Sequence, residues 1–323
     1  MPIFACLLTP TLLRFSACTC AAADPILTRD QNPFLAGFGL PLPFTSRVEG
    51  GPATRADVTL DWSSSATIQV TESEEIVADA ETRSTHLMFQ HRFSNGLAMR
   101  VSVPWIYRGP GVLDAFVEGW HDALGFPQGS RRRLPRNEYL VGYARDAEIL
   151  SLRREGTQGF GDLAVDFGTS LHESERAAAS VWLTVKLPTG DEEDQLGSGA
   201  VDAGVTLSGD MRLTERWWLY GQTTGLYLGQ GEFLPELQRD RLWSGLLGIA
   251  WHVAAPVTLK LQVDGHTGAF DGTDIEFLGG ATIATLAVDY RVDRWLLSFA
   301  VGEDLDVKAS PDVNFHFALR RKF

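Results

Sequence analysis

The sequence has few cysteines and no long apolar run. Its three cysteines, Cys6, Cys18 and Cys20, all precede residue 21. If the leader that contains them is removed, the remaining chain excludes a disulfide framework, a thiol nucleophile and a cysteine-ligated metal. No stretch approaches the roughly 18 apolar residues of a transmembrane helix, which excludes a helical inner-membrane protein. A membrane β-barrel stays open, because its strands alternate apolar and polar residues.

Positive charge and catalytic motifs are also scarce. The chain carries 28 Lys and Arg residues against 41 Asp and Glu residues, a net charge of −13, which argues against nucleic acid as a partner. It contains no G-x-S-x-G, P-loop, H-E-x-x-H or dinucleotide fingerprint. The sequence therefore favours no common class of soluble enzyme, and we expect no cofactor and no metal.

The first 53 residues divide into two segments. Residues 1–23 combine an apolar run with a small-residue end at Ala21, Ala22 and Ala23, which predicts an export signal. A lipoprotein site at Cys18 or Cys20 is the weaker alternative. Residues 24–53 are rich in proline, glycine and phenylalanine, which disfavours regular structure. They are predicted to form either a periplasmic tail or a plug inside a barrel, because their phenylalanines are poorly placed in water.

The rest of the chain alternates with the period of a β-strand. In 97–108 the odd positions are apolar, whereas Arg100, Ser102 and Arg108 lie on the other face. The segment 257–266 alternates in the same way. Three segments are mixed, and their faces cannot be assigned from the sequence: 217–228, 242–252 and 276–290.

The linkers between these segments alternate long and short from residue 177 onward, which is typical of outer-membrane barrels with short periplasmic turns and long extracellular loops. The prediction is an all-β, closed antiparallel transmembrane barrel over 54–323. Its twelve strands are 54–65, 80–93, 97–107, 159–171, 177–187, 200–212, 216–228, 241–252, 256–267, 276–290, 294–304 and 312–323. The segment 138–154 reads as a hairpin above the membrane; if it crosses instead, the barrel has fourteen strands.

Alternation also predicts which charged residues face the barrel interior. They carry both signs and should pair, because an unpaired ion in a narrow lumen is costly. Their role is either structural or the selectivity of a narrow pore. The candidate luminal residues are Arg92, Arg100, Asp162, Asp166, Lys186, Asp202, Lys260 and Asp264, joined by His266, His316, Arg320 and Lys322.

Residues 112–124 break the strand pattern. Apolar residues recur at helical spacing, and Gly125 and Pro127 end the run, so we expect an amphipathic helix in the third extracellular loop region. It would fold over the barrel mouth or act as a gate. A sharper alternative makes His121 a general base oriented by Glu118, as in a lipid-modifying hydrolase.

Two charged clusters lie in the predicted loops. Arg131, Arg132, Arg133 and Arg136 would face lipopolysaccharide phosphates or simply be solvated. The acidic run 191–194 lacks the spacing of a calcium loop.

The last strand has apolar residues at alternate positions and ends on an aromatic residue. Phe317, Leu319 and Phe323 share the lipid-facing parity, and this pattern resembles the signal read by the outer-membrane barrel assembly machinery. Arg321 departs from the pattern, but it lies close enough to the end to reach the periplasmic headgroups.

Several segments resemble a family of proteobacterial outer-membrane proteins of unknown function: 27–43, 112–131, "GFGD" (159–162) and "LPTGD…LGSGAVD" (187–202). The last two also resemble outer-membrane proteins attached to the phenol meta-cleavage pathway. The resemblance implies a β-barrel in the outer membrane and no established activity. The function expected is a passive channel for small, apolar or aromatic molecules; the alternatives are the hydrolase and a structural, lipopolysaccharide-contacting barrel.

Overall fold

A computed structural model describes residues 24–48, 52–305 and 309–323, so the predicted export signal lies outside the described residues. Within them, twelve long strands form one ring. They are β1 (Ala53–Val70), β2 (Glu74–Arg92), β3 (Leu97–Gly109), β7 (Leu163–Glu173), β8 (Ala177–Leu187), β9 (Asp202–Arg212), β10 (Trp217–Tyr227), β11 (Arg241–Ala254), β12 (Val257–His266), β13 (Ala281–Val292), β14 (Trp295–Asp304) and β15 (Val313–Lys322).

The ring closes between its first and last long strands. β1 pairs antiparallel with β15, and Asp57 lies opposite Arg320 while Asp61 lies opposite His316. Closure is required in a membrane, because lipid cannot satisfy the backbone groups of an open sheet edge. The predicted closed antiparallel barrel of twelve strands is confirmed.

The hairpin predicted at 138–154 does not cross the barrel. It consists of β4 (Leu140–Arg145) and β5 (Glu148–Arg153), and β4 pairs with Glu74–Asp79, the outer end of β2. Its turn residues Asp146 and Ala147 have φ values of 52° and 64°, the left-handed conformation of a tight two-residue turn. The fourteen-strand alternative is therefore wrong.

Several strand boundaries differ from prediction. β1 continues to Val70 rather than ending at 65, and β2 begins at Glu74 rather than at 80. The strand predicted at 159–171 is split into β6 (Thr157–Phe160) and β7, both paired with β3. The strand predicted at 276–290 begins only at Ala281, because Glu276–Leu278 form the short 3-10 helix η2.

The two faces of the barrel wall differ as alternation predicts. On β3, Leu97 and Trp105 are 37% and 41% exposed, whereas Arg100 and Arg108 are 2% and 1% exposed. The same contrast recurs around the ring, where large apolar side chains such as Leu207, Leu247 and Leu286 are exposed. A surface of this kind suits acyl chains, and the buried polar face lines the interior.

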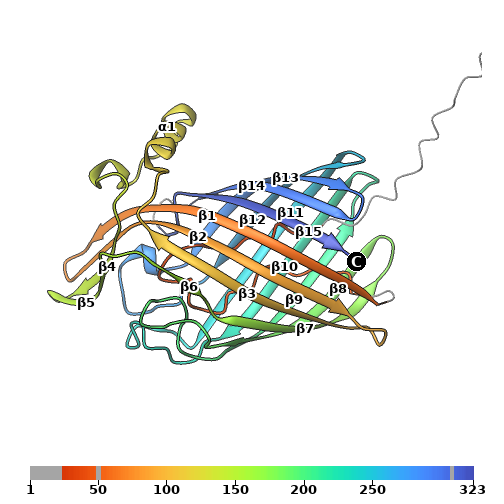
Figure 1. Ribbon diagram of the computed structural model, residues 1–323, viewed down its shortest axis with the longest axis horizontal. Helices are drawn as coiled ribbons and strands as arrows, with labels where there is room; N and C mark the ends of the chain where they lie inside the picture. The colour runs from red at the N-terminus through yellow and green to blue at the C-terminus, as the bar shows by residue number, and fades with distance from the viewer. Residues whose placement is uncertain (1–23, 49–51, 306–308) are drawn as a thin grey trace, which may run out of the picture.

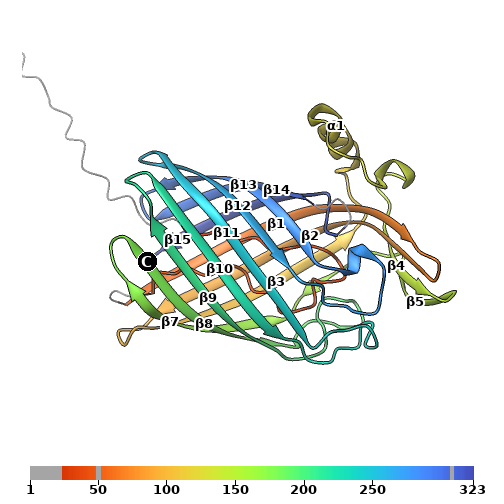
Figure 2. The same cartoon turned by 180° about the vertical axis from the view of Figure 1, so that it is seen from behind.

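The long connections gather at one end of the barrel and the chain terminus at Phe323 lies at the other (Figures 1 and 2). The predicted helix is α1 (Asp114–Leu124), followed by the 3-10 helix η1 (Arg131–Arg133). It lies in the connection from β3 to β4, the second rather than the third connection at this end. No helix among the described residues is long and apolar enough to span a membrane.

Candidate functional site

The barrel interior holds the N-terminal residues 24–48, which we call the luminal segment. The thin red trace runs inside the ring in both views (Figures 1 and 2). Its apolar side chains are withdrawn from water: Phe34, Leu35, Phe38, Leu40, Leu42 and Phe44 are each at most 6% exposed. These described residues therefore lie inside the ring.

Side chains of the barrel wall bind the backbone of the luminal segment. The amide of Ile26 donates to Gln262 Oε1 at 3.0 Å, and the amide of Phe44 donates to Gln222 Oε1 at 2.9 Å. Ser180 and Ser208 donate to the carbonyl groups of Thr45 and Phe44 at 3.1 and 3.2 Å. These bonds satisfy buried polar groups without adding the segment to the sheet as a strand.

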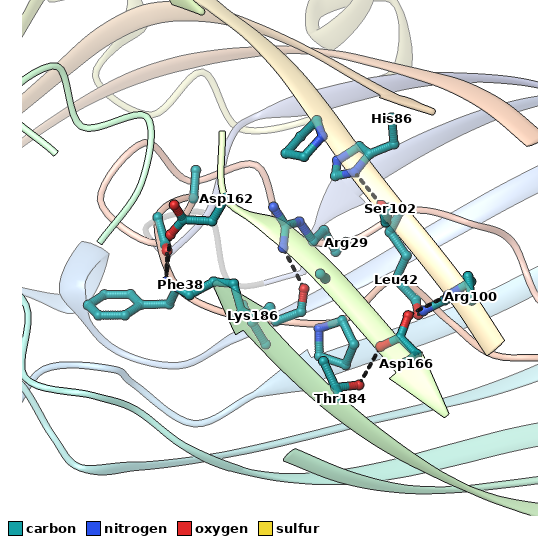
Figure 3. Close-up of a pocket in the computed structure, with 17 residues that line it drawn as sticks. Arg29, Phe38, Leu42, His86, Arg100, Ser102, Asp162, Asp166, Thr184 and Lys186 are labelled. Carbon is teal, nitrogen blue, oxygen red and sulfur yellow. Dashed lines mark hydrogen bonds and ion pairs between the residues drawn. The ribbon is translucent and has the colours of Figure 1, made fainter. Parts of the chain in front are cut away.

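Arg100 connects the wall to the middle of the luminal segment. Its Nε donates to Asp166 Oδ2 at 2.8 Å, and its terminal nitrogens donate to the carbonyl groups of Pro43 and Leu42 at 2.8 and 2.9 Å. The guanidinium also lies 3.8 Å from the ring centre of Phe44. Figure 3 shows Arg100, Asp166 and Leu42 converging in this way.

Lys186 makes a second connection nearer the outer end. Its Nζ lies 2.6 Å from Asp162 Oδ2 and 3.1 Å from Asp202 Oδ2, and it donates to the Gly37 carbonyl at 3.1 Å. Asp202 in turn accepts the Gly39 amide at 2.8 Å. The two carboxylates balance the buried ammonium, and Lys186 and Asp202 bind the segment at Gly37 and Gly39.

Asp162 also explains why "GFGD" and "LPTGD…LGSG" occur together. Its carboxylate accepts the amides of Thr189, Gly190 and Ser198 at 3.0, 2.8 and 3.1 Å. One buried side chain therefore fixes both ends of the connection between β8 and β9.

Ion pairs also line the interior where β1 pairs with β15 and where β12 pairs with β13. Asp57 accepts from Arg320 Nε at 2.5 Å, and Asp61 accepts from His316 and from Thr28 of the luminal segment at 3.0 and 2.6 Å. Lys260 pairs with Asp289 at 2.5 Å.

The structure thus brings most predicted luminal residues together. Arg100, Asp162, Asp166, Lys186, Asp202 and Lys260 are buried, and Asp264 and Arg92 are partly buried. Lys322 is exposed at the rim. Their role in selectivity remains a hypothesis.

Sequence reasoning missed other residues of the interior. Arg29 and Asp30 belong to the luminal segment, and Asp57, Asp61 and His86 belong to β1 and β2. The strand residues share the parity of their buried neighbours, so alternation in 54–65 and 80–93 contained the signal. The luminal segment has no periodicity, and only its contacts reveal Arg29 and Asp30.

Little space remains around the luminal segment. A cavity of about 40 Å³ lies between it and the wall, lined by residues that include Arg29, His86, Arg100 and Lys186 (Figure 3). A second, of about 20 Å³, lies under Phe34 and Phe38. A water needs roughly 10–15 Å³ by this measure, so these cavities accommodate a few waters and no organic solute.

At the outer end of the barrel, a buried arginine joins α1 to the barrel wall. Arg131 bonds Asp114 of α1 at 2.5 Å, Asp312 at 2.6 Å and Ser64 of β1 at 3.1 Å. Burial raises the pKa of Asp312, and the Arg131 guanidinium opposes this shift. This contact ties α1 to the connection between β14 and β15. With its side chain buried, Arg131 is not placed to contact lipopolysaccharide, in contrast to expectation.

The other loop arginines lie nearer the surface. Arg132 pairs with Asp122 at 2.7 Å, and Arg136 makes a two-pronged bond to Glu118, which lowers the pKa of Glu118. Arg133 is exposed. Lipopolysaccharide contact through these three residues remains a prediction.

His121 does not have the surroundings expected of a general base. Its Nδ1 lies 2.8 Å from the Pro127 carbonyl, and its Nε2 lies 3.7 Å from Glu303, so Glu118 does not orient it. The ring is buried between α1 and the turn that follows. No cluster of three or more metal-ligating side chains occurs in the part of the chain that the structure describes.

The fold is that of outer-membrane β-barrels. The chain belongs to the family described as "Protein of unknown function (DUF3187)", whose model matches residues 4–323. No curated protein matches the sequence.

One solved structure shares the fold, and two others are less similar. The COG4313 outer membrane channel from Pseudomonas putida F1 is similar with a TM-score of 0.59 at 15% identity, covering 87% of this chain and 99% of that chain. The NanC porin has a TM-score of 0.49 at 8% identity, covering 83% of this chain and 100% of that one. The Ralstonia pickettii toluene transporter TbuX has a TM-score of 0.39 at 10% identity, covering 85% and 90%. At these identities the likeness concerns the fold alone.

Proposed function

We propose that this chain is a passive outer-membrane channel for small solutes, and that the luminal segment closes it in the conformation described. One observation carries the proposal: the segment that fills the interior is bound mainly by wall side chains, as with Gln262, Gln222 and Asp202, and belongs to no strand of the barrel. It can therefore move while every strand pair of the ring stays intact.

The energetics of these contacts favour a gate over a permanent core. Each neutral hydrogen bond between wall and segment contributes only about 1 kcal/mol, because water replaces it when the segment leaves. Arg100 and Lys186, which that movement exposes, already have partners on the wall in Asp166 and Asp162. Opening would wet this paired surface, but it would also break the ion pairs that Arg47 and Asp30 of the segment make with Asp210 and His266.

Apolar contacts hold the segment most firmly near the outer end. Phe34, Phe38 and Leu40 pack in a buried cluster with Phe270 and Phe277 of the connection between β12 and β13. Opening thus requires the segment and this loop to separate. The same cluster would offer apolar contacts to a passing aromatic solute, which fits the solute class suggested by the phenol-pathway resemblance.

The barrel exterior supports placement in the outer membrane. Apolar side chains cover it, and the terminal strand carries the pattern attributed to barrel assembly, with Phe317, Leu319 and Phe323 all exposed. Outer-membrane lipids, lipopolysaccharide and the assembly machinery are the partners that this placement implies.

Planar bilayer recordings test the proposal. The full chain should show a small or intermittent conductance, and deletion of residues 24–48 should give a stable, larger one. A barrel that stays sealed after the deletion, while retaining its β-sheet circular dichroism, would leave the structural barrel as the better account. The hydrolase alternative has no support in the geometry of His121.

A further inference from the structure

Arg108 is a buried cation whose surroundings contain no carboxylate partner. Its side chain projects inward from the outer end of β3 and is 1% exposed. Among the described residues, no ion pair includes Arg108, although burying an unpaired guanidinium is costly.

The bonding of Arg108 is incomplete along one side. Nη1 donates to the Gln195 carbonyl at 2.9 Å, but Nε and Nη2 are buried without a hydrogen-bond partner among the described residues. The hydroxyl of Thr157, which lies opposite Arg108 in the pairing of β3 with β6, is buried and unpartnered as well. Three donor atoms on facing strands thus lack acceptors.

The side of the guanidinium formed by Nε and Nη2 is the one that binds a carboxylate in two other places in this chain. Arg131 uses Nε and Nη2 on Asp312, at 3.1 and 2.6 Å. Arg136 uses the same two nitrogens on the two oxygens of Glu118. This planar fork matches the spacing of carboxylate oxygens. Arg108 therefore presents the same recognition edge with no protein carboxylate on it.

We propose that the Nε–Nη2 edge of Arg108 binds the carboxylate of a small organic acid at the outer end of the barrel interior, with the Thr157 hydroxyl as a further donor. Ile106 lies on the same face of β3 two residues before Arg108, and the Leu196 side chain lies near Gly159, the β6 partner of Ile106; both are nearly fully buried and would contact the apolar body of such an acid. The closed interior has no cavity large enough for such an acid, so the acid reaches this position only when the luminal segment moves, and the inference rests on the proposed channel function.

The position also adjoins the cavities beside the luminal segment. Gln195, which accepts the bond from Arg108, lines the 20 Å³ cavity together with Gly37 and Phe38. Gly37 and Phe38 line the 40 Å³ cavity too, where Arg29, Arg100 and Lys186 follow. A carboxylate released inward from Arg108 would therefore meet further cations, of which Arg100 and Lys186 are already paired with Asp166 and Asp162.

Titration calorimetry on the purified full chain in detergent tests the site, with benzoate as the probe. We expect about one benzoate per chain, weaker binding of inorganic phosphate and none of neutral benzamide at the same concentration. Arg108→Met should weaken benzoate binding roughly ten- to a hundredfold, as loss of a charge-assisted bidentate bond implies. Arg136→Met is the matched control, because the fork of Arg136 is already filled by Glu118; its benzoate affinity should equal that of the wild type.

Arg108→Lys keeps the site testable if the Arg108→Met variant does not fold. It keeps the charge but loses the fork, so its affinity should fall between those of the wild type and Arg108→Met. Equal benzoate affinity in the wild type and either Arg108 variant would overturn the site, as would no binding to the wild type. A wild type that conducts without binding benzoate overturns only this inference, whereas one that binds benzoate but never conducts overturns only the channel.

Discussion

Arg100 of β3 and Asp166 of β7 form a buried ion pair, and the Arg100 guanidinium also binds the backbone of the luminal segment. The Nε–Oδ2 distance is 2.8 Å, and the remaining guanidinium nitrogens bind the Leu42 and Pro43 carbonyls. Arg100 therefore neutralises Asp166 on the barrel wall and holds the luminal segment inside the barrel. Removing the cation would free the segment and leave Asp166 uncompensated.

Arg100→Met should loosen the closed state. Loss of one partner of a buried ion pair costs about 3–5 kcal/mol, and part of this cost is relieved when water enters around Asp166. In planar bilayers we expect more frequent opening than in the wild type. Arg176→Met is the control, since Arg176 is exposed in the turn between β7 and β8 at the other end of the barrel; its opening frequency should not change. Equal opening frequencies in the two variants would show that Arg100 does not stabilise the closed state.

Arg131→Met should release α1 from the barrel end. It removes the only buried cation that joins Asp114 and Asp312 in the described residues, at a cost of about 3–5 kcal/mol. Hydrogen exchange should become faster in α1 and in the connection between β14 and β15, with the strands still protected. Arg132→Met breaks an exposed pair with Asp122, which contributes about 0–1 kcal/mol, so its exchange pattern should match that of the wild type. Unchanged exchange in the Arg131 variant would contradict this role.

Deleting Phe323 should impair membrane assembly more than Arg321→Tyr does. The Phe323 amide donates to the Thr54 carbonyl at 2.9 Å and so completes the seam between β15 and β1. Arg321 lies over the rings of Trp295 and Phe323, at 4.9 and 4.8 Å, contacts that a tyrosine can partly replace. The measurement is the fraction of heat-modifiable, folded protein in outer-membrane preparations. Similar fractions for the two variants would argue against a special role of the terminal residue.

The strands were predictable because alternation reflects a lipid outside and a polar inside. Alternation could not assign the two faces of the three mixed segments, for a physical reason that β10 illustrates. Trp218 and Tyr220 face inward and are 2% and 3% exposed, since they pack with Ala250 and under the Arg47 guanidinium of the luminal segment. Interior apolar packing of this kind removes the contrast that alternation depends on.

The loop contacts were the least predictable part of the site. Arg131 belongs to a run of similar arginines, and nothing in the run distinguishes the one that becomes buried from its exposed neighbour Arg132. The difference arises from Asp114 and Asp312, which are far apart in sequence and meet only in the folded barrel. Likewise, the sequence predicted that the aperiodic luminal segment is apolar. It did not predict which wall side chains bind the segment.

A reversible covalent link between wall and segment tests the central claim most directly. A Cβ built on Gly39 would lie 2.9 Å from that of Asp202, so the double variant Gly39→Cys, Asp202→Cys can form a disulfide with a backbone shift of about 1 Å. The three native cysteines all precede residue 21, and replacing them by serine removes competing thiols.

In planar bilayers, the oxidised double variant should be closed, and adding a reductant to the same membrane should start conductance. Each single-cysteine variant should respond to neither treatment. Conductance that is identical in the oxidised and reduced double variant, with the disulfide verified by mass spectrometry, would contradict gating by the luminal segment.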